Sequence, residues 1–336
     1  GAPLVTRVTG VRKQLSQAFG FVVPQFRIRD SLDLPANEYR VVLGGVELAR
    51  AKARPDAILA IDTGEVSKNH GLTGQPTTDP SFGCPALWIA LAERDHAVAE
   101  GFLTVAADTV IATHLNQLLQ ERGAQLLGPE EVRSLLDAVK ERSPGLVEAI
   151  HPDPLSLAAI TRMLRALLAD GISLAHPVPI LSSLALALQV TKDFDALVDH
   201  IRADLGGWLV GQVCPPTQAL GVLTLDAELE SAILGGMRDP ATGQPVIEPD
   251  CARMIGDAVT AHMAEHSARG LALIVQPPAR RALAALLRQR APGCLVLSIS
   301  ELPPSQPVEV IAVIGGRASP PAPPQLPDAS QEVLAA

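Results

Sequence analysis

Apolar and polar positions follow a helical period at the start of the chain and a strand period soon after it. Four apolar residues recur at helical spacing: Val8, Val11, Leu15 and Phe19. Gly20 follows them, so the pattern predicts a helix that ends at a glycine cap. Residues 21–32 have an extended composition, with Pro24 favouring a sheet edge. Residues 38–51 place β-rich arms around Gly44-Gly45, which is typical of a hairpin.

Short strands and one long loop follow from about residue 58 to 106. Strands are expected at 57–62, 86–90 and 102–105, with a helix at 93–101. Residues 64–83 read as a polar loop rich in Gly, Pro and Thr, and loops of that length in compact domains usually have a function. A helix is then expected over 108–128, with Asp108 as its N-cap.

The rest of the chain changes character twice more. Residues 127–206 look all-helical, with helix starts expected at Pro129, at Asp153-Pro154 and at Pro177. Residues 179–190 are apolar nearly all round and are expected to be buried. From 207 to 316 strands alternate with helices, which indicates a layered sheet. Residues 317–336 are Pro/Ala-rich and are expected to form a flexible tail.

Composition narrows the class of protein. The 336 residues fit two to four compact units. A formal net charge of -9 argues against general nucleic-acid binding, which needs clustered Lys and Arg. No window of about 20 apolar residues predicts a membrane span. The chain starts with Gly1 and an immediate amphipathic segment, which suggests a part of a longer protein. The cysteines lack C-x-x-C spacing and are expected to be reduced and buried: Cys84, Cys214, Cys251 and Cys294.

The loop between the first two strands of 58–106 carries the most informative residue. Phe82 lies between Ser81 and Gly83, directly after Asp79-Pro80. Aromatic residues are only 3% of the chain, so one among turn residues is notable. It could be the apolar wall of a recognition hollow with a polar rim, or it could pin the loop to its own sheet.

Two other groups could carry enzymatic chemistry. His262, Glu265 and His266 match H-x-x-E-H, a zinc-hydrolase pattern that places both histidines on one helix face. The competing interpretation is a solvated helix face. Thr113 and His114 are neighbours that point about 100° apart on a helix, so His114 is expected to be structural. No nucleotide-binding or nucleophile motif occurs, and no cofactor, metal or catalytic residue is predicted.

Several segments together resemble one family. They are FGFVVPQFRIRDSLDL (19–34), YRVVLGGVEL (39–48), TDPSFGCPALWI (78–89), GFLTV (101–105), DTVIATHLNQLL (108–119), QLLGPEEVRSLLD (125–137), LVLSISEL (295–302) and VIGG (313–316). This pattern is similar to the cytoplasmic part of the FlhA family of flagellar export gates, which has counterparts in injectisomes. IRD at 28–30 and TVIATHL at 109–115 look flagellar.

The resemblance implies an α/β multi-subdomain fold: mixed α/β subdomains at both ends, an inserted small α/β subdomain and a central all-helical subdomain. It suggests subdomain 1 at 1–57 and 107–126, subdomain 2 at 58–106, subdomain 3 at 127–206 and subdomain 4 at 207–316. In this family the N-terminal part, absent from this sequence, spans the membrane, and the soluble part forms a ring, expected to be nonameric, on the cytoplasmic face of the bacterial inner membrane.

The resemblance also implies a non-enzymatic docking and gating role in type III protein export. In that family the site binds export chaperone–substrate complexes and helps switch substrate class. Its residues match Asp79, Pro80, Phe82 and Thr113 here, while other export apparatus components are further partners. The alternatives are a zinc-dependent hydrolase using His262, Glu265 and His266, and a plain scaffold with no pocket.

Overall fold

The chain folds into two compact units, residues 1–198 and 199–336. The computed structural model describes residues 3–66, 71–267 and 269–316. The predicted tail at 317–336 and part of the predicted loop, 67–70, therefore lie outside the described residues. In the described parts of the chain, no helix is long and apolar enough to cross a membrane. The four subdomain boundaries stay a prediction.

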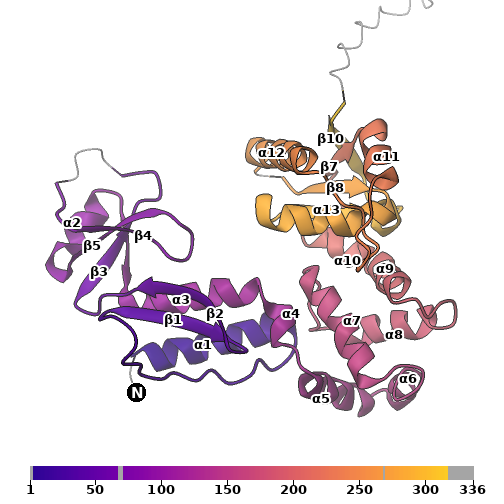
Figure 1. Ribbon diagram of the computed structural model, residues 1–336, viewed down its shortest axis with the longest axis horizontal. Helices are drawn as coiled ribbons and strands as arrows, with labels where there is room; N and C mark the ends of the chain where they lie inside the picture. Colours follow the sequence, from indigo (N-terminus) through magenta and orange to yellow (C-terminus); the bar gives the residue numbers. More distant parts are fainter. Residues whose placement is uncertain (1–2, 67–70, 268, 317–336) are drawn as a thin grey trace, which may run out of the picture. The chain divides into compact units, whose positions relative to one another are not determined.

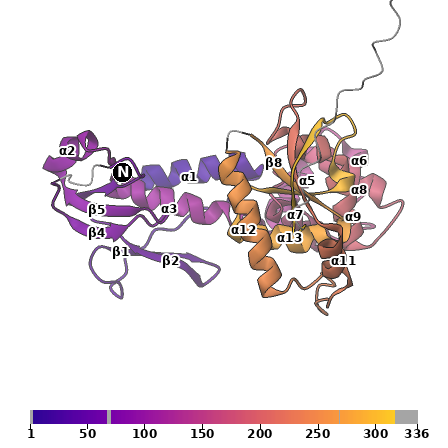
Figure 2. The ribbon, with the colours of Figure 1, turned by 90° about the horizontal axis from the view of Figure 1, so that it is seen from above.

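The first unit begins with a helix and a hairpin. Helix α1 (Pro3–Phe19) ends at Gly20, which has a φ of 81°, as its spacing predicts. Strands β1 (Glu38–Leu43) and β2 (Val46–Lys52) pair antiparallel around Gly44 and Gly45, both at positive φ. Figure 1 and Figure 2 show α1 lying beside α3 (Ala107–Gln120).

Residues 21–32, which were expected to be extended with Pro24 at a sheet edge, do not form a strand. Side chains of α1 bind the backbone N–H and carbonyl of Val23, which a neighbouring strand would bind in a sheet. Arg12 Nε donates to the Val23 carbonyl at 2.7 Å, and the Val23 N–H donates to Ser16 Oγ at 2.9 Å. The next residue, Pro24, has no N–H to give. The segment therefore follows α1 rather than a sheet.

A four-stranded antiparallel sheet in the order β4-β5-β3-β6 forms the next layer. Its strands are β3 (Ala57–Ile61), β4 (Gln75–Thr78), β5 (Pro85–Ala90) and β6 (Leu103–Ala106). The expected loop 64–83 is wrong in part, since it contains β4 at the sheet edge, where Pro76 is tolerated. Val110 of α3 packs on one face with Trp88, and Ala97 of α2 (Arg94–Ala99) packs on the other. A 3₁₀ turn, η1 (Leu91–Glu93), precedes α2.

The helix expected over 108–128 is two helices, α3 and the short α4 (Gly123–Leu126). Helix α3 also starts earlier than predicted, at Ala107, because β6 leads directly into it and Ala106 takes the N-cap position. Asp108 instead lies in the first turn, where its Oδ1 accepts from the Thr109 N–H at 2.9 Å and its Oδ2 is 2.6 Å from Arg7 Nε. The carboxylate still lies near the positive end of the helix.

Helices make up the remainder of the first unit. They are α5 (Pro129–Lys140), α6 (Pro144–Glu148), α7 (Leu157–Ala169) and α8 (Pro177–Ala187), while α9 (Phe194–Asp204) runs across the division at 198/199. The start predicted at Asp153-Pro154 is wrong, because Ser156 caps α7 by accepting from the Ala159 N–H at 3.2 Å. Burial of 179–190 is incomplete, since Leu186 and Val190 are exposed.

A close backbone approach joins α1 to this helical region. The Leu174 N–H donates to the Phe19 carbonyl at 2.8 Å, and Ser173 Oγ donates to the Ala18 carbonyl at 2.6 Å. A Cβ added to Gly20 would lie 1.9 Å from the Ala175 nitrogen. Only glycine therefore fits at this junction.

The second unit is a parallel α/β sheet in the order β10-β7-β8-β9, as the alternation predicts. Its strands are β7 (Leu220–Leu225), β8 (Leu271–Val275), β9 (Leu295–Ser298) and β10 (Val308–Ile314), and its helices are α10 (Gly206–Gly211), α11 (Ala227–Gly235), α12 (Pro249–Glu265) and α13 (Pro277–Arg290). Every residue of β8 is buried. The predicted fold class is confirmed.

Candidate functional site

The turn between β4 and β5 holds the loop that the sequence singled out. The Asp79 N–H donates to the Cys84 carbonyl at 2.8 Å, and the Gly83 N–H donates to the Asp79 carbonyl at 2.9 Å. Gly83 adopts a φ of 74°, which an L side chain rarely takes. Residues 79–84 therefore form a closed turn with its own hydrogen bonds, in place of the end of a long loop.

Asp79 and Phe82 have opposite exposures in this turn. The side chain of Phe82 is 67% exposed, whereas Asp79 is only 3% exposed. Asp79 Oδ2 accepts from the Phe82 N–H at 2.8 Å. A charged acceptor strengthens such a bond, so the buried carboxylate fixes the backbone from which the ring projects. Pro80 and Ser81, between them, are half-buried.

Behind the turn, Asp79 lies near a pair formed by Tyr39 of β1, which is half-buried, and His114 of α3, which is buried. The Tyr39 hydroxyl lies 2.7 Å from His114 Nδ1, and the two rings meet edge to face at 5.8 Å. Burial lowers the pKa of His114, and the negative charge of Asp79 opposes that shift. Burial, with a smaller contribution from Asp79, raises the pKa of Tyr39. His114 is a structural histidine, as the sequence indicated.

Packing and charge both relate the turn to α3. Cys84, at the end of the turn, packs with Val110 and Ala107 of α3 in the cluster around Trp88. The charge of Asp79 reaches His114, and Thr113 is the residue before it, half-buried on the same helix. In the described residues no hydrogen bond joins Thr113 to the turn. No sequence pattern assigned Tyr39 to this site, although it is the single tyrosine of the chain and could have been noticed for that reason.

A groove of about 970 Å³ lies close to this pair in the same unit. Residues of α1, the segment 24–36, strand β1 and helix α3 line it, Tyr39 among them. Leu115 and Leu119 of α3 provide apolar wall, and Arg27, Arg29 and Arg40 provide charge. The turn and the groove are thus connected through Tyr39.

The sequence of this chain is similar to those of known proteins over most of its length. The sequence matches the FHIPEP family over residues 1–307. The chain belongs to the FHIPEP family. It is 32% identical over 317 residues to the flagellar biosynthesis protein FlhA of Bacillus subtilis, covering 94% of this chain and 46% of that protein. It is 33% identical over 316 residues to FlhA of Salmonella typhimurium, covering 94% and 45%. The chain spans about half the length of these curated relatives.

Solved structures share the fold of this FHIPEP chain. The Chlamydia pneumoniae CdsV protein, solved in complex with CdsO, matches with a TM-score of 0.72 at 22% identity, covering 92% of this chain and 89% of CdsV. The nonameric SctV-C of EPEC matches with a TM-score of 0.70 at 16% identity, covering 94% of both chains. At these identities the likeness shows the fold alone.

The zinc-hydrolase interpretation finds no support in the family. The two relatives compared above are flagellar biosynthesis proteins by name. His262, Glu265 and His266 do come together at the C-terminal end of α12, where their ligand atoms lie within 4.8 Å of one another.

Proposed function

We propose that this chain is a docking and gating domain of a type III protein export apparatus, of the flagellar kind. In this proposal export chaperones bring their bound substrates to the turn 79–84, and the domain helps to switch between substrate classes. Asp79, Pro80, Phe82 and Thr113 form the centre of the chaperone site. The role is one of binding and gating, without catalysis or nucleic acid.

The observation that carries the proposal is the exposed ring of Phe82 on a turn held by a buried carboxylate. A large apolar side chain in water at a fixed position loses little entropy on binding and gains about 1.5–3 kcal/mol when a partner buries it. That range suits a reversible contact. The membership of the FHIPEP family and the names of the matching relatives support export as the process.

Phe82→Ala tests this function directly. Calorimetry would measure the affinity of the chain for a late flagellar substrate in complex with its export chaperone. Loss of about 1.5–3 kcal/mol corresponds to an affinity weaker by about 10- to 150-fold. Because the ring is exposed, the thermal transition of the variant should stay where it is.

Leu91→Ala is the matched control for this experiment. Leu91 is 61% exposed and directly follows β5. The substitution therefore removes a comparable exposed apolar side chain that lies outside the turn. We expect the control to bind like the unchanged chain. Equal affinity of all three proteins, each folded, would refute the docking role of Phe82.

We further propose that copies of this chain form a ring, nonameric in the intact protein, on the cytoplasmic face of the bacterial inner membrane. The nonameric state of SctV-C and the complex of CdsV with CdsO support a ring that meets other export components. The membrane attachment would come from the part of the relatives that this chain does not span. Electron microscopy of the membrane-extracted full-length protein tests the ring, and a strictly monomeric particle would contradict it.

A further inference from the structure

The C-terminal end of α12 gathers three side chains that the export function does not use. His262 and His266 are one helical turn apart, and Glu265 lies between them in sequence. Each offers one ligand atom, and these atoms lie within 4.8 Å of one another. The two imidazole rings have centroids 6.4 Å apart, and His262 Nδ1 lies 3.4 Å from Glu265 Oε2.

Each of the two histidines has a ring nitrogen to which no hydrogen bond is assigned among the described residues. His266 Nδ1 lies 3.0 Å from the His262 carbonyl, which can only accept, so the ring must donate from Nδ1. The neutral ring then carries its lone pair on Nε2, and a backbone carbonyl is a common partner for the outer nitrogen of a metal-binding histidine. His262 Nδ1 is buried and makes no hydrogen bond to any described residue.

From this geometry we infer that His262, Glu265 and His266 bind one divalent transition-metal ion of the zinc class. Two neutral imidazoles and one carboxylate are ligands that Zn²⁺ takes, with bonds of about 2.0–2.2 Å. In a tetrahedral site, ligand atoms lie about 3.4 Å apart. The side chains must therefore close by roughly an ångström, which small χ rotations of partly exposed groups on one helical turn can supply.

The end of α12 leaves open positions for a cation. The end of a helix carries a partial negative charge from its carbonyls. His266 also lines a hollow of about 380 Å³, together with Met263, Arg269 and Gly293, and the Arg269 guanidinium is paired with the Glu309 carboxylate. Water in that hollow can complete the coordination that three protein ligands leave open. The inference concerns binding alone and includes no hydrolytic step.

The experiment uses the full chain freed of metal by a chelator. Calorimetry with Zn²⁺ measures affinity and stoichiometry, and Mg²⁺ serves as a hard cation that prefers oxygen ligands. The variants are His262→Ala, His266→Ala and Glu265→Gln. His96→Ala is the matched control, because His96 also faces an acid one turn away, with Nε2 3.8 Å from Glu100 Oε1, on a short helix without a second histidine.

We expect one Zn²⁺ per chain and no measurable Mg²⁺ binding. Removal of either histidine should weaken zinc affinity by at least about tenfold, and Glu265→Gln should weaken it too. His96→Ala should bind zinc as the unchanged chain does. Circular dichroism checks that each variant folds. Absence of zinc binding by the unchanged chain, full affinity in both α12 histidine variants, or an equal loss in His96→Ala would overturn the inference.

Discussion

Glu301→Gln should destabilise the second unit severely, because it leaves two guanidinium groups buried around a neutral amide. Glu301, in the 3₁₀ turn η2 (Ile299–Glu301), is 2% exposed, and Arg202 and Arg280 are each 1% exposed. Arg202 donates twice to the carboxylate, at 2.7 Å from Nε and 3.0 Å from Nη2. Arg280 Nε lies 3.6 Å from Glu301 Oε1.

The magnitude follows from this burial. Breaking a buried ion pair by removing one charge costs about 3–5 kcal/mol, since the remaining charge keeps its desolvation penalty. With a urea m-value of about 2 kcal/mol per molar, the unfolding midpoint should fall by roughly 1.5–2.5 M. Asp199, 3.8 Å from Arg280 Nη2, compensates only part of the loss, because it is half exposed and burial raises its own pKa.

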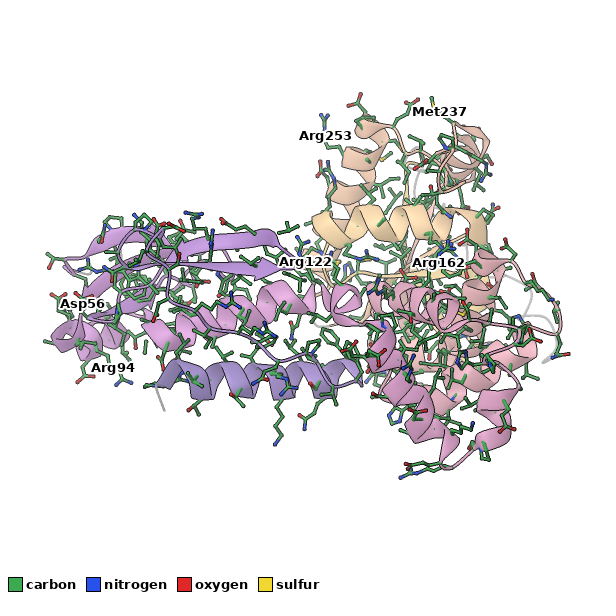
Figure 3. The ribbon with its side chains drawn as sticks, turned by 60° about the horizontal axis from the view of Figure 1, so that its bottom comes forward. Asp56, Arg94, Arg122, Arg162, Met237 and Arg253 are labelled. Carbon is green, nitrogen blue, oxygen red and sulfur yellow. The ribbon has the colours of Figure 1, made fainter. Side chains whose placement is uncertain are left out.

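Fluorescence can report on the second unit by itself. The chain has two tryptophans, Trp88 in the first unit and Trp208 in α10 of the second. In a Trp88→Phe background, Trp208 follows the second unit during urea unfolding. Asp250→Asn is the control, because its pair with Arg253 at 3.1 Å is solvent-exposed and Arg253 projects outward in Figure 3, so its midpoint should hardly change.

A midpoint shift below about 0.5 M for Glu301→Gln, similar to that of Asp250→Asn, would refute the reasoning. It would mean that water reaches the network or that the two arginines find other acceptors. A replacement of the whole network by apolar residues is a second test. Arg202→Met and Arg280→Met together with Glu301→Leu should recover much of the stability that Glu301→Gln loses, since no buried charge is then left without a partner.

Three further perturbations test the first unit. Gly20→Ala should lower stability by at least about 2 kcal/mol through its positive φ and its backbone clash, whereas Gly10→Ala, with open space in the middle of α1, should raise it by about 0.5–1 kcal/mol; urea unfolding compares them. Because burial lowers the pKa of His114, the unfolded state binds a proton first, so stability should fall as the pH drops below about 6.5; His114→Gln should flatten that dependence, and an unchanged slope would contradict it. Asp79→Ala should speed amide hydrogen exchange at Phe82, because the N–H loses its acceptor, whereas Asp79→Asn, which keeps an acceptor oxygen, should change it less.

Local signals in the sequence predicted the elements whose causes are local. The glycines at 20, 44 and 45 mark positive φ, and the alternation after residue 207 marks a parallel sheet. Strand β4 was missed because its residues, Gln75–Thr78, look like loop, and only pairing with β5 makes them a strand. The bond between Arg202 and Glu301 joins residues 99 apart, which no periodic pattern can reveal.

The candidate site shows the same division between local and distant causes. The sequence left two interpretations of Phe82 open, a ring that receives a partner and a ring that pins the loop to its own sheet, and the ring is exposed. The surroundings of Asp79 were not predictable, because Tyr39 and His114, whose pKa values its charge raises, come from two other elements. From the sequence, the Asp79 carboxylate is expected to lie at the polar rim of a binding hollow. Only the fold shows that it is buried near Tyr39 and His114.

The burial of Asp79 changes how a binding site at this turn would work. Its carboxylate already accepts from the Phe82 N–H and faces the Tyr39–His114 pair, so little of it remains to meet a partner. Its contribution to docking would then be positional: it holds the turn in one conformation before the partner arrives, which lowers the entropy cost of binding. The same charge acts on Tyr39 of β1 and on His114 of α3, so the surroundings of the turn include the sheet β4-β5-β3-β6 and the α1–α3 layer. A movement between those layers would therefore change the direction in which Phe82 is presented, and docking would respond to a change in the fold well behind the ring itself.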